Sequence, residues 1–325
     1  MIPDRYLLDS DQLEITFETL VLPRLLEQTA PTKGQTPSTV YLGGQPGAGK
    51  TRARSAIIEQ YDGNLYPIDP DRLRMFHPDY DELCDEDPVH MAEYTNPFAG
   101  AMVDRAVSYC EAHGIDYIIE GTWRSPEDMA KWMRRGHGRG RSVHAIAMAV
   151  PPALSSASTV KRYLDAIADG ESARWTNVGY FDPINRAMPD YVRAIACNAL
   201  VDRFTVADRN GLIPGSDFRG PKTRLGMPVW TSRFDRPLDE TEIRLCEDTM
   251  NAVETMLDHA SPEYAEARII RGSVMRTVRE SRETNAGGSC PRTFVPVSPH
   301  AGLVWVNPYV RGDGTTVSGY WQDRS

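Results

Sequence analysis

The segment GQPGAGKT at residues 44–51 constrains this chain more than any other, because it fits the pattern G-x-x-x-x-G-K-[ST]. A short apolar run precedes it and a helical pattern follows it, which is the context that a phosphate-binding loop requires. Its glycines let backbone N–H groups turn toward phosphate oxygens, and the N-terminus of the next helix adds positive potential. The segment predicts nucleotide binding, with Lys50 on the β- and γ-phosphates and the Thr51 hydroxyl on Mg²⁺. The predicted nucleotide-binding residues are Gly44, Gln45, Pro46, Gly47, Ala48, Gly49, Lys50 and Thr51.

Short apolar runs and longer helical patterns alternate around this loop. Apolar residues on successive positions are typical of strands that are covered on both faces, and they occur at 39–44, 65–69, 116–121, 143–150 and, less cleanly, 202–208. Candidate helices lie between them at about 50–60, 95–113, 125–135, 153–168 and 182–196. This alternation predicts an α/β fold of the P-loop kinase type, with a central parallel sheet and helices on both faces.

The two ends of the chain follow other patterns. A helix is predicted over 9–29 with Ser10 as its N-cap, and 211–238 is loop-rich. Two helical patterns follow at about 239–259 and 262–283, and two β-like runs around RGDG predict a terminal hairpin. We therefore divide the chain into an N-terminal helical element at 1–37, a kinase domain at 38–212 with a lid at about 152–180, and a C-terminal extension at 213–325 whose role stays open.

Composition excludes some classes of partner. The chain has 36 Lys and Arg against 45 Asp and Glu, a net charge of −9, which argues against a nucleic-acid or anionic-membrane binder. No apolar run approaches the length of about 20 residues that a bilayer span requires. The five cysteines are scattered without a CxxC pair, so we expect a reducing, cytoplasmic location. The basic turn RRGHGRGR at 134–141 is predicted to be a solvated loop.

Candidate catalytic groups lie where predicted strands end, because ligands of parallel sheets bind beyond the carboxyl ends of the strands. Asp69 or Asp71 could accept a proton from a substrate hydroxyl, or could cap the next helix. Glu120 ends the third run and is either a substrate or magnesium-water contact or an ordinary strand end. Arg162 and Arg174 follow the fourth run, where lid arginines stabilise a transferring phosphoryl group, although solvated arginines are the alternative.

Several motifs together resemble the zeta toxin family, the toxin half of epsilon/zeta toxin–antitoxin systems. The resemblance covers roughly residues 38–208 and keeps the family's order of motifs. These motifs are GGQPGAGKTRARSAI, IDPDRLRMFHPDYDEL, YTNPFAGAMVDRAV, YIIEGTWRS, AMAVP, TVKRY and SARWT.

This resemblance implies phosphoryl transfer from ATP, or GTP, to the 3′-hydroxyl of the sugar in UDP-N-acetylglucosamine, with a product that poisons cell-wall synthesis. It implies that Lys50 and Thr51 hold phosphates and magnesium and that Asp71 is the catalytic base. Carried over in the same way, Glu120, Thr122 and Arg124 contact the uridine-sugar substrate, and Arg162 and Arg174 clamp the phosphates from the lid. It also implies a small helical antitoxin that covers the nucleotide site near the N-terminal helix, where simple packing of that helix on the sheet edge is the alternative.

Two departures from the family pattern bear on the acceptor. Asp104 stands where relatives have Glu in the substrate pocket, and the segment that leads to SARWT is one residue shorter. A P-loop kinase of another small hydroxyl substrate (a sugar nucleotide, an antibiotic or a nucleotide) and a non-catalytic nucleotide-binding module therefore stay open as alternatives. The chain lacks HExxH, GxSxG and NKxD motifs, which argues against metalloprotease, α/β-hydrolase and GTPase-switch functions.

Overall fold

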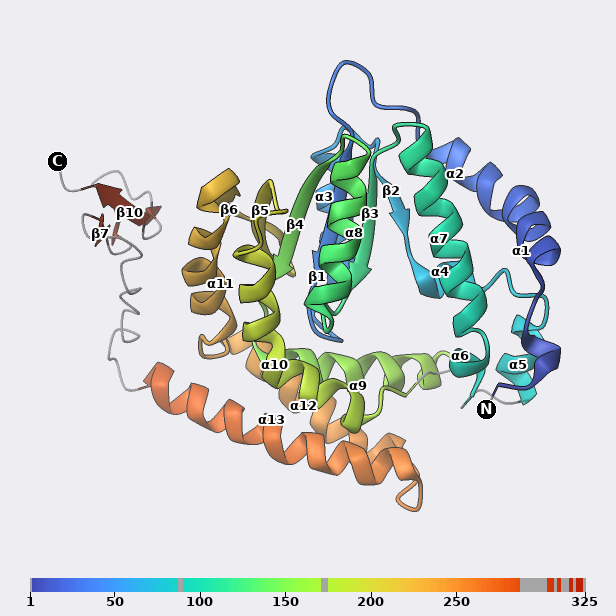
Figure 1. Cartoon of the computed structure of the whole chain (residues 1–325). Helices are drawn as coiled ribbons and strands as arrows, with labels where there is room; N and C mark the ends of the chain where they lie inside the picture. Colours follow the sequence, from blue (N-terminus) through green and yellow to red (C-terminus); the bar gives the residue numbers. More distant parts are fainter. Residues whose placement is uncertain are drawn as a thin grey trace.

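A six-stranded sheet forms the centre of the described chain, with the strand order β2-β3-β1-β4-β5-β6 in this computed structural model (Figure 1). The structure describes residues 2–86, 90–170 and 175–286, and the backbone of four short strands between 303 and 323. The strands β1 to β5 run parallel, and β6 pairs antiparallel with β5 at the edge. The strand bounds are β1 (Ser38–Gly43), β2 (Tyr66–Ile68), β3 (Tyr117–Gly121), β4 (Ser142–Met148), β5 (Arg203–Asp208) and β6 (Gly211–Arg219).

Helices cover both faces of the sheet, as the sequence predicts. Their bounds are α1 (Ser10–Thr16), α2 (Leu22–Gln28), α3 (Lys50–Glu59), α4 (Pro70–Arg74), α5 (Tyr80–Glu86), α6 (Met91–Tyr94), α7 (Asn96–Ala112), α8 (Pro126–Gly138), α9 (Pro152–Ala168), α10 (Val178–Ala196), α11 (Gly226–Phe234), α12 (Glu240–Met256) and α13 (Pro262–Ala286). Successive residues of β1 face opposite sides of the sheet, which explains its unbroken apolar run. Val40 and Leu42 pack with residues of α3, α9, α12 and α13, whereas Tyr41 packs with residues of α8, α10 and α11.

The five predicted strands and the helices between them are confirmed with small shifts at their ends. Helix α10 begins at Val178 because the Asn177 side chain accepts the backbone N–H of Gly179, and Pro183 lies inside the helix. At the N-terminus the predicted Ser10 cap is wrong. Asp9 forms a capping box with Gln12, since each side chain accepts the other's backbone N–H.

The predicted loop at 211–238 is wrong, because this segment contains β6 and α11. Strand β6 carries Pro214 and Gly215 and a shifted register against β5, and these features hide it in the sequence. Pro221 lies in the first turn of a short 3-10 helix, Gly220–Leu225, where proline is tolerated.

The predicted solvated loop at 134–141 is also wrong, because residues 134–138 belong to α8 and Arg141 is buried. This side chain is buried at the amino end of the sheet, where its guanidinium donates to the Thr39 hydroxyl and to the carbonyls of Ser38, Cys110 and Ile115. Arg141 therefore satisfies backbone carbonyls near the starts of β1 and β3, which is a structural role.

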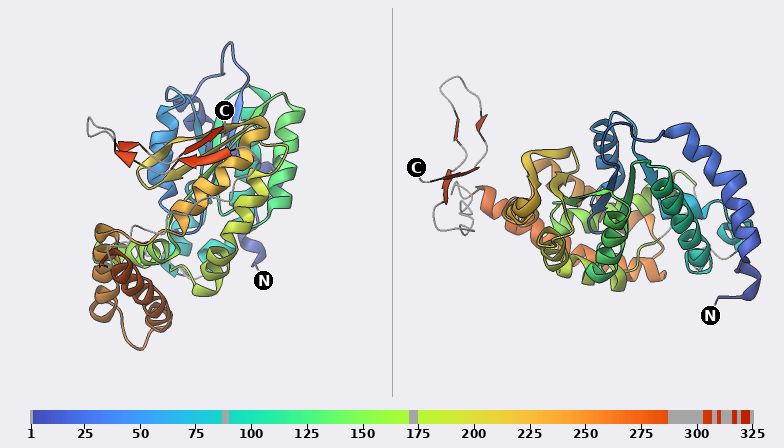
Figure 2. Two further views of the ribbon diagram at one scale, coloured as in Figure 1. Left: turned by 90° about the vertical axis from the view of Figure 1, so that its left-hand side faces the viewer. Right: turned by 45° about the horizontal axis from the view of Figure 1, so that its top comes forward.

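The C-terminal helices belong to the main hydrophobic core. Met250 of α12 and Val274 of α13 are buried in the same cluster as Leu154 and Val160 of α9. The N-terminal helix lies at the β2 edge of the sheet, where Phe17 and neighbouring residues pack with β2 and α7 (Figures 1 and 2).

Near the end of the chain, β7 (Leu303–Val306) pairs antiparallel with β10 (Tyr320–Asp323), and β8 (Tyr309–Val310) with β9 (Thr316–Val317). This pairing confirms the predicted hairpin. Among the described residues, the structure contains no helix with the length and apolarity needed to cross a membrane.

Candidate active site at the carboxyl ends of the strands

The phosphate loop leaves β1 in the centre of the sheet and enters α3. Gly47 and Gly49 have positive φ angles of 76° and 86°, which glycine adopts without steric cost. A Cβ atom on Gly47 would lie 2.1 Å from the carbonyl oxygen of Ser155, so the loop packs directly on the first turn of α9. The buried Gln45 side chain strengthens this contact, because its Nε2 donates to the Val150 carbonyl at 2.7 Å and to the Ser155 hydroxyl at 3.0 Å.

Lys50 folds back over the loop that precedes it. Its Nζ donates to the carbonyls of Gly44 at 2.8 Å and Gln45 at 3.1 Å. Burial lowers the pKa of Lys50 to about 8, although the negative charges of Glu120 and Asp71 act to raise it and Arg162 acts to lower it further. The structure therefore brings these three predicted residues into electrostatic range of the loop lysine.

A network of ion pairs fixes the carboxylates on the β3 side of the loop. Arg54, one helical turn beyond Lys50, donates to Glu120 Oε1 at 2.7 Å and to Asp69 Oδ2 at 3.2 Å. Burial raises the pKa of Glu120, and the positive charge of Arg54 opposes that rise. Asp69 also caps α4 by accepting the backbone N–H of Asp71 at 3.0 Å.

Asp71 differs from Asp69 in its accessibility. Its side chain is 70% exposed in the first turn of α4, and one carboxylate oxygen lies 3.7 Å from Arg74 Nη2. Of the two aspartates that the sequence leaves open, Asp69 is the cap, and Asp71 presents its carboxylate to solvent.

The segment after β3 turns sharply at Trp123, which has a positive φ of 55°. The buried indole covers Gly43, where a Cβ atom would lie 2.0 Å from the ring. Thr122 is half-buried and Arg124 is exposed, with its guanidinium 5.6 Å from the ring centre of Tyr180. The strained turn thus places Thr122 and Arg124 beside the start of the phosphate loop.

The other three predicted site residues are Arg162, Asp104 and Arg174. In the described part of the chain, Arg162 and Asp104 do not form hydrogen bonds or ion pairs with the residues above. Arg162 lies on α9 and donates to the Thr176 hydroxyl at 3.2 Å. Asp104 is exposed on α7, and within the described part of the chain no hydrogen bond or ion pair joins its carboxylate to the other candidates. Arg174 lies outside the described residues.

Comparison with known proteins identifies the family. The model of the family described as zeta toxin matches residues 23–214 of the chain. This chain belongs to the zeta toxin family. Toxin zeta of Streptococcus pyogenes is 30% identical over 179 residues, which are 55% of this chain and 62% of that protein. Toxin PezT of Streptococcus pneumoniae is 33% identical over 175 residues, which are 54% of this chain and 69% of that protein.

A solved structure extends the likeness beyond the family match. A chain from the PezAT chromosomal toxin–antitoxin system of Streptococcus pneumoniae superposes with a TM-score of 0.65 at 24% identity. The superposition covers 78% of this chain and 98% of that chain. That chain and the chain described above therefore share one fold.

Three residues near the site escaped the sequence analysis. Arg54 follows Lys50 by four positions on one helix, a spacing that places both side chains on the same helix face. Arg209 directly follows β5, and its Nη2 donates to the Gly47 carbonyl and the Ser158 hydroxyl, both at 2.6 Å. The strand-end rule that singled out Glu120 applies to Arg209 equally.

The third missed residue, Glu266, lies on α13 beyond the zeta toxin family match. Its carboxylate accepts hydrogen bonds from the indole of Trp175 at 2.8 Å, the amide of Asn177 at 2.6 Å and the backbone N–H of Val178 at 2.9 Å. Glu266 thus anchors residues 175–178, the segment whose Thr176 hydroxyl accepts the hydrogen bond from Arg162. Because the two segments lie far apart in the sequence, no local pattern predicts this contact.

Proposed function

We propose that this zeta toxin family member is a kinase that transfers the γ-phosphoryl group of ATP, or of GTP, to the 3′-hydroxyl of the sugar in UDP-N-acetylglucosamine. The product would act as a poison of cell-wall synthesis. The observation that carries the proposal is the phosphate loop with Lys50 folded over it, together with Asp71 on α4, Glu120 at the end of β3 and Arg162 on α9, whose charges act on that lysine. Phosphoryl transfer needs a base, a phosphate loop and added positive charge in this relation.

In the proposed reaction the loop amides and Lys50 bind the β- and γ-phosphates. Asp71 accepts the proton of the acceptor hydroxyl as its oxygen bonds to the γ-phosphorus, and the bond from that phosphorus to the leaving nucleoside diphosphate breaks. The positive charge of Arg162 stabilises the negative charge on the transferring group. Arg174 is proposed to add a second positive charge from the lid.

Mg²⁺ fits the same site. In kinases this ion takes few protein ligands and fills its shell with phosphate oxygens and water, and the hydroxyl of Thr51 is exposed in the first turn of α3. When bound, the ion neutralises charge on the β- and γ-phosphates. Within the described residues no group of three or more His, Cys, Asp or Glu side chains forms a separate metal site.

The acceptor is proposed to bind between β3 and the helices beyond it. Glu120, Thr122 and Arg124 follow one another at the end of β3 and would contact the uridine sugar. Arg124 supplies charge for its diphosphate, and Asp104 on α7 would line a more distant part of the pocket. These anionic substrates would then be bound by local positive groups in a chain of net charge −9.

A small helical antitoxin is the proposed partner. The solved relative comes from a toxin–antitoxin system, and the N-terminal helix here exposes apolar residues, with Ile15 at 60% and Leu26 at 52% exposure. Exposed apolar patches are typical of interaction surfaces. Free cysteines such as Cys197 and Cys84 fit the reducing cytoplasm, which is the proposed location.

The proposed function is tested by mass spectrometry of a reaction that contains ATP, Mg²⁺ and a panel of uridine-diphosphate sugars. We expect one phosphate to be added to UDP-N-acetylglucosamine. Asp71→Ala should lower turnover by a factor of about 10²–10⁴, the contribution of a general base, and should leave ATP binding intact. Asp69→Asn is the matched comparison, because asparagine keeps the cap of α4 and removes only the negative charge, so turnover should fall far less.

Two outcomes would contradict parts of the proposal. Phosphorylation of another metabolite, with every uridine sugar untouched, would refute the acceptor and leave the kinase in place. Full toxicity in cells of both Asp71→Ala and Lys50→Ala variants would refute catalysis and favour a nucleotide-binding module.

A further inference from the structure

The segment of residues 175–178 lies between α9 and α13 and contacts both helices. On the α9 side, Arg162 donates to the Thr176 hydroxyl at 3.2 Å. The next residue of α9, Tyr163, meets the Trp175 indole edge-on, with the ring centres 4.9 Å apart. Two consecutive residues of α9 thus contact two consecutive residues of the segment. The position of the segment is therefore coupled to the orientation of the Arg162 side chain.

On the α13 side, the contacts converge on the Glu266 carboxylate. Its Oε2 accepts the Trp175 indole N–H and the Val178 backbone N–H, and its Oε1 accepts the Asn177 amide. Hydrogen bonds to an ionised carboxylate are about twice as strong as those between neutral groups. Because the three donors come from one stretch of four residues, a single side chain of α13 restrains the segment up to the first residue of α10.

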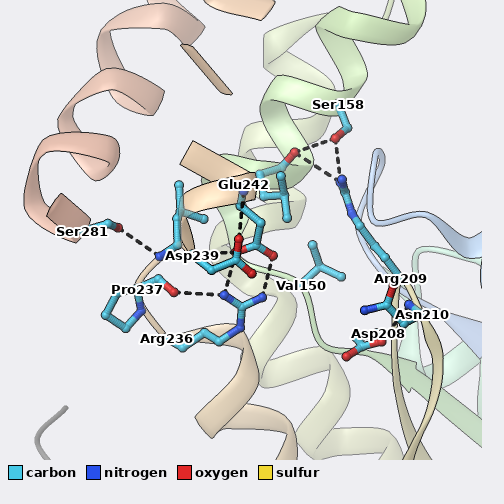
Figure 3. A network of polar contacts seen from close by, with 12 residues as sticks. Val150, Ser158, Asp208, Arg209, Asn210, Arg236, Pro237, Asp239, Glu242 and Ser281 are labelled. Carbon is cyan, nitrogen blue, oxygen red and sulfur yellow. Dashed lines mark hydrogen bonds and ion pairs between the residues drawn. The ribbon is translucent and has the colours of Figure 1, made fainter. Parts of the chain in front are cut away.

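Helix α13 is itself held firmly against the rest of the fold. Ile270, one turn beyond Glu266, is buried in the hydrophobic cluster that also contains Val160 of α9. Further along the helix, the Ser281 hydroxyl accepts the backbone N–H of Leu238 at 3.0 Å (Figure 3). Glu266 therefore belongs to a rigid element, as a precise positioning contact requires.

Arg162 lies close to the phosphate loop. It lines a cavity of about 330 Å³ together with Ser158, which is one turn earlier on α9. The Ser158 hydroxyl accepts a hydrogen bond from Arg209 at 2.6 Å (Figure 3). The same nitrogen of Arg209 donates to the Gly47 carbonyl of the loop at 2.6 Å. The positive charge of Arg162 also acts to lower the pKa of Lys50, so a shift of this arginine changes the electrostatic potential at the loop.

On the basis of the proposed kinase function, we infer that Glu266 is a positioning residue for phosphoryl transfer. It holds residues 175–178 against α9, and the Thr176 hydroxyl then orients Arg162 toward the transferring phosphoryl group. The effect of Glu266 on the rate passes through Arg162. Because Glu266 lies beyond the matched family segment at 23–214, a C-terminal helix outside that segment takes part in shaping the proposed site.

This contact should affect the rate more than it affects substrate binding. A positive charge that is aimed at the transferring group stabilises the charge that develops in the transition state. Ground-state binding of the nucleotide rests mainly on the loop amides and Lys50 in the proposed reaction. A displaced Arg162 should therefore lower kcat and leave the KM values for ATP and for the acceptor nearly unchanged.

Substitutions in the full chain test this role. Glu266→Ala removes the carboxylate, whereas Glu266→Gln keeps an oxygen that can accept two of the three donors. Thr176→Val removes the hydroxyl that accepts from Arg162 and keeps the shape of the side chain. Glu280→Ala is the control, because Glu280 is exposed on the same helix and its carboxylate makes no hydrogen bond to residues 175–178 in the described part of the chain. Thermal melting followed by circular dichroism gives an assay temperature at which each variant is folded.

The values of kcat and KM are measured with ATP, Mg²⁺ and the acceptor that the panel of uridine-diphosphate sugars identifies. We expect Glu266→Ala to lower kcat about 10- to 100-fold, as misplacement of a catalytic group does, and to change either KM less than about threefold. Thr176→Val should also lower kcat. Glu266→Gln should keep kcat within about threefold of the wild type, and Glu280→Ala should match the wild type.

The sharpest comparison combines Glu266→Ala with Arg162→Ala. If Glu266 acts through Arg162, the double variant should have a kcat within about twofold of Arg162→Ala alone, because no arginine is left to position. Unchanged kcat in Glu266→Ala, or the same fold loss with and without Arg162, would overturn the inference. A wild-type chain that phosphorylates no sugar of the panel would instead refute the proposed function, and the inference with it, so the two failures are distinguishable.

Discussion

Lys50 is half-buried in the phosphate loop, although the proposed nucleotide binding depends on its positive charge. Burial favours the neutral amine and lowers the pKa of Lys50 to about 8. The two loop carbonyls that accept its hydrogen bonds hold the ammonium over the loop. Phosphate oxygens that take the place of these carbonyls would favour the charged form and raise the pKa of the lysine in the complex.

This difference predicts how ATP binding depends on pH. Below about pH 8 the free lysine is protonated, and above that value binding must be accompanied by proton uptake. The Kd for ATP should therefore rise above pH 8, by up to about tenfold per pH unit. The phosphates of ATP are fully ionised in this range and contribute no slope. The measurement is calorimetry between pH 7 and about pH 9.5 in buffers of different ionisation enthalpy, which report the proton uptake.

Lys50→Arg is the control, because a guanidinium stays charged across this pH range. The variant should bind ATP with little dependence on pH. An equal slope in the wild type and in Lys50→Arg would show that another group is responsible.

Among single residues, the site could be predicted best where a sequence motif determines the backbone conformation. The loop residues 44–51 could be predicted because glycine, lysine and threonine at that spacing have one known use. From position alone Asp69 and Asp71 could not be separated, because each lies at the beginning of the same short helix, and only the family resemblance favoured Asp71. The structure separates them through the contact of Asp69 with Arg54, which is a tertiary contact.

At the scale of elements, we consider the link between α13 and residues 175–178, near the end of the predicted lid. Glu266 accepts three hydrogen bonds from residues 175–178, and the Thr176 hydroxyl in that segment accepts a hydrogen bond from Arg162 on α9. The position of the segment beside α9 therefore depends on a helix almost a hundred residues further along the chain.

Removing this anchor should destabilise the fold. Glu266→Ala leaves the Trp175 indole N–H and the Val178 N–H without their acceptor, which should cost about 1–3 kcal/mol of unfolding free energy. Chemical denaturation followed by circular dichroism measures the loss. Glu280→Ala is the control, because Glu280 is exposed on the same helix and its side chain makes no such contact in the described residues. Equal stability of the two variants would contradict the anchoring role.

The elements also show where sequence patterns succeed and fail. β1, β3 and β4 are covered on both faces and could be predicted from their unbroken apolar runs. β6 lies at the edge, alternates buried and exposed residues irregularly and contains Pro214, so its pattern is typical of a loop. An edge strand such as β6 is recognised by its backbone pairing with the neighbouring strand, and this pairing is seen only in the folded structure.

For the whole molecule, the C-terminal helices are part of the hydrophobic core that covers the central sheet. α12 and α13 share one hydrophobic cluster with α9 and with Val40 and Leu42 of the central strand. The sequence could predict both helices from their periodicity. It could not predict what they pack against. An apolar helix face indicates that the face is buried, but it does not indicate which element buries it.

This shared core predicts a single unfolding transition. Met250 is fully buried between the helices, so Met250→Ala should lower the unfolding free energy by about 2–5 kcal/mol. Circular dichroism and tryptophan fluorescence should report coincident denaturation curves that shift together. Arg244→Ala, at an exposed position of α12, should shift neither. Two separate transitions, of which only one shifts, would show that the helices fold as an independent unit.

The order of the strands has a consequence for the newly synthesised chain. Within the central sheet β1 is made before the other strands, yet it pairs with β3 and β4, which are made much later. The loop that follows β1 then gains its contact with Arg209 after β5 has been added. Because a parallel strand needs its neighbours before it is stable, we expect that the nascent chain cannot hold a nucleotide in a finished loop until Arg209 has emerged. During translation, the proposed nucleotide site is therefore completed late.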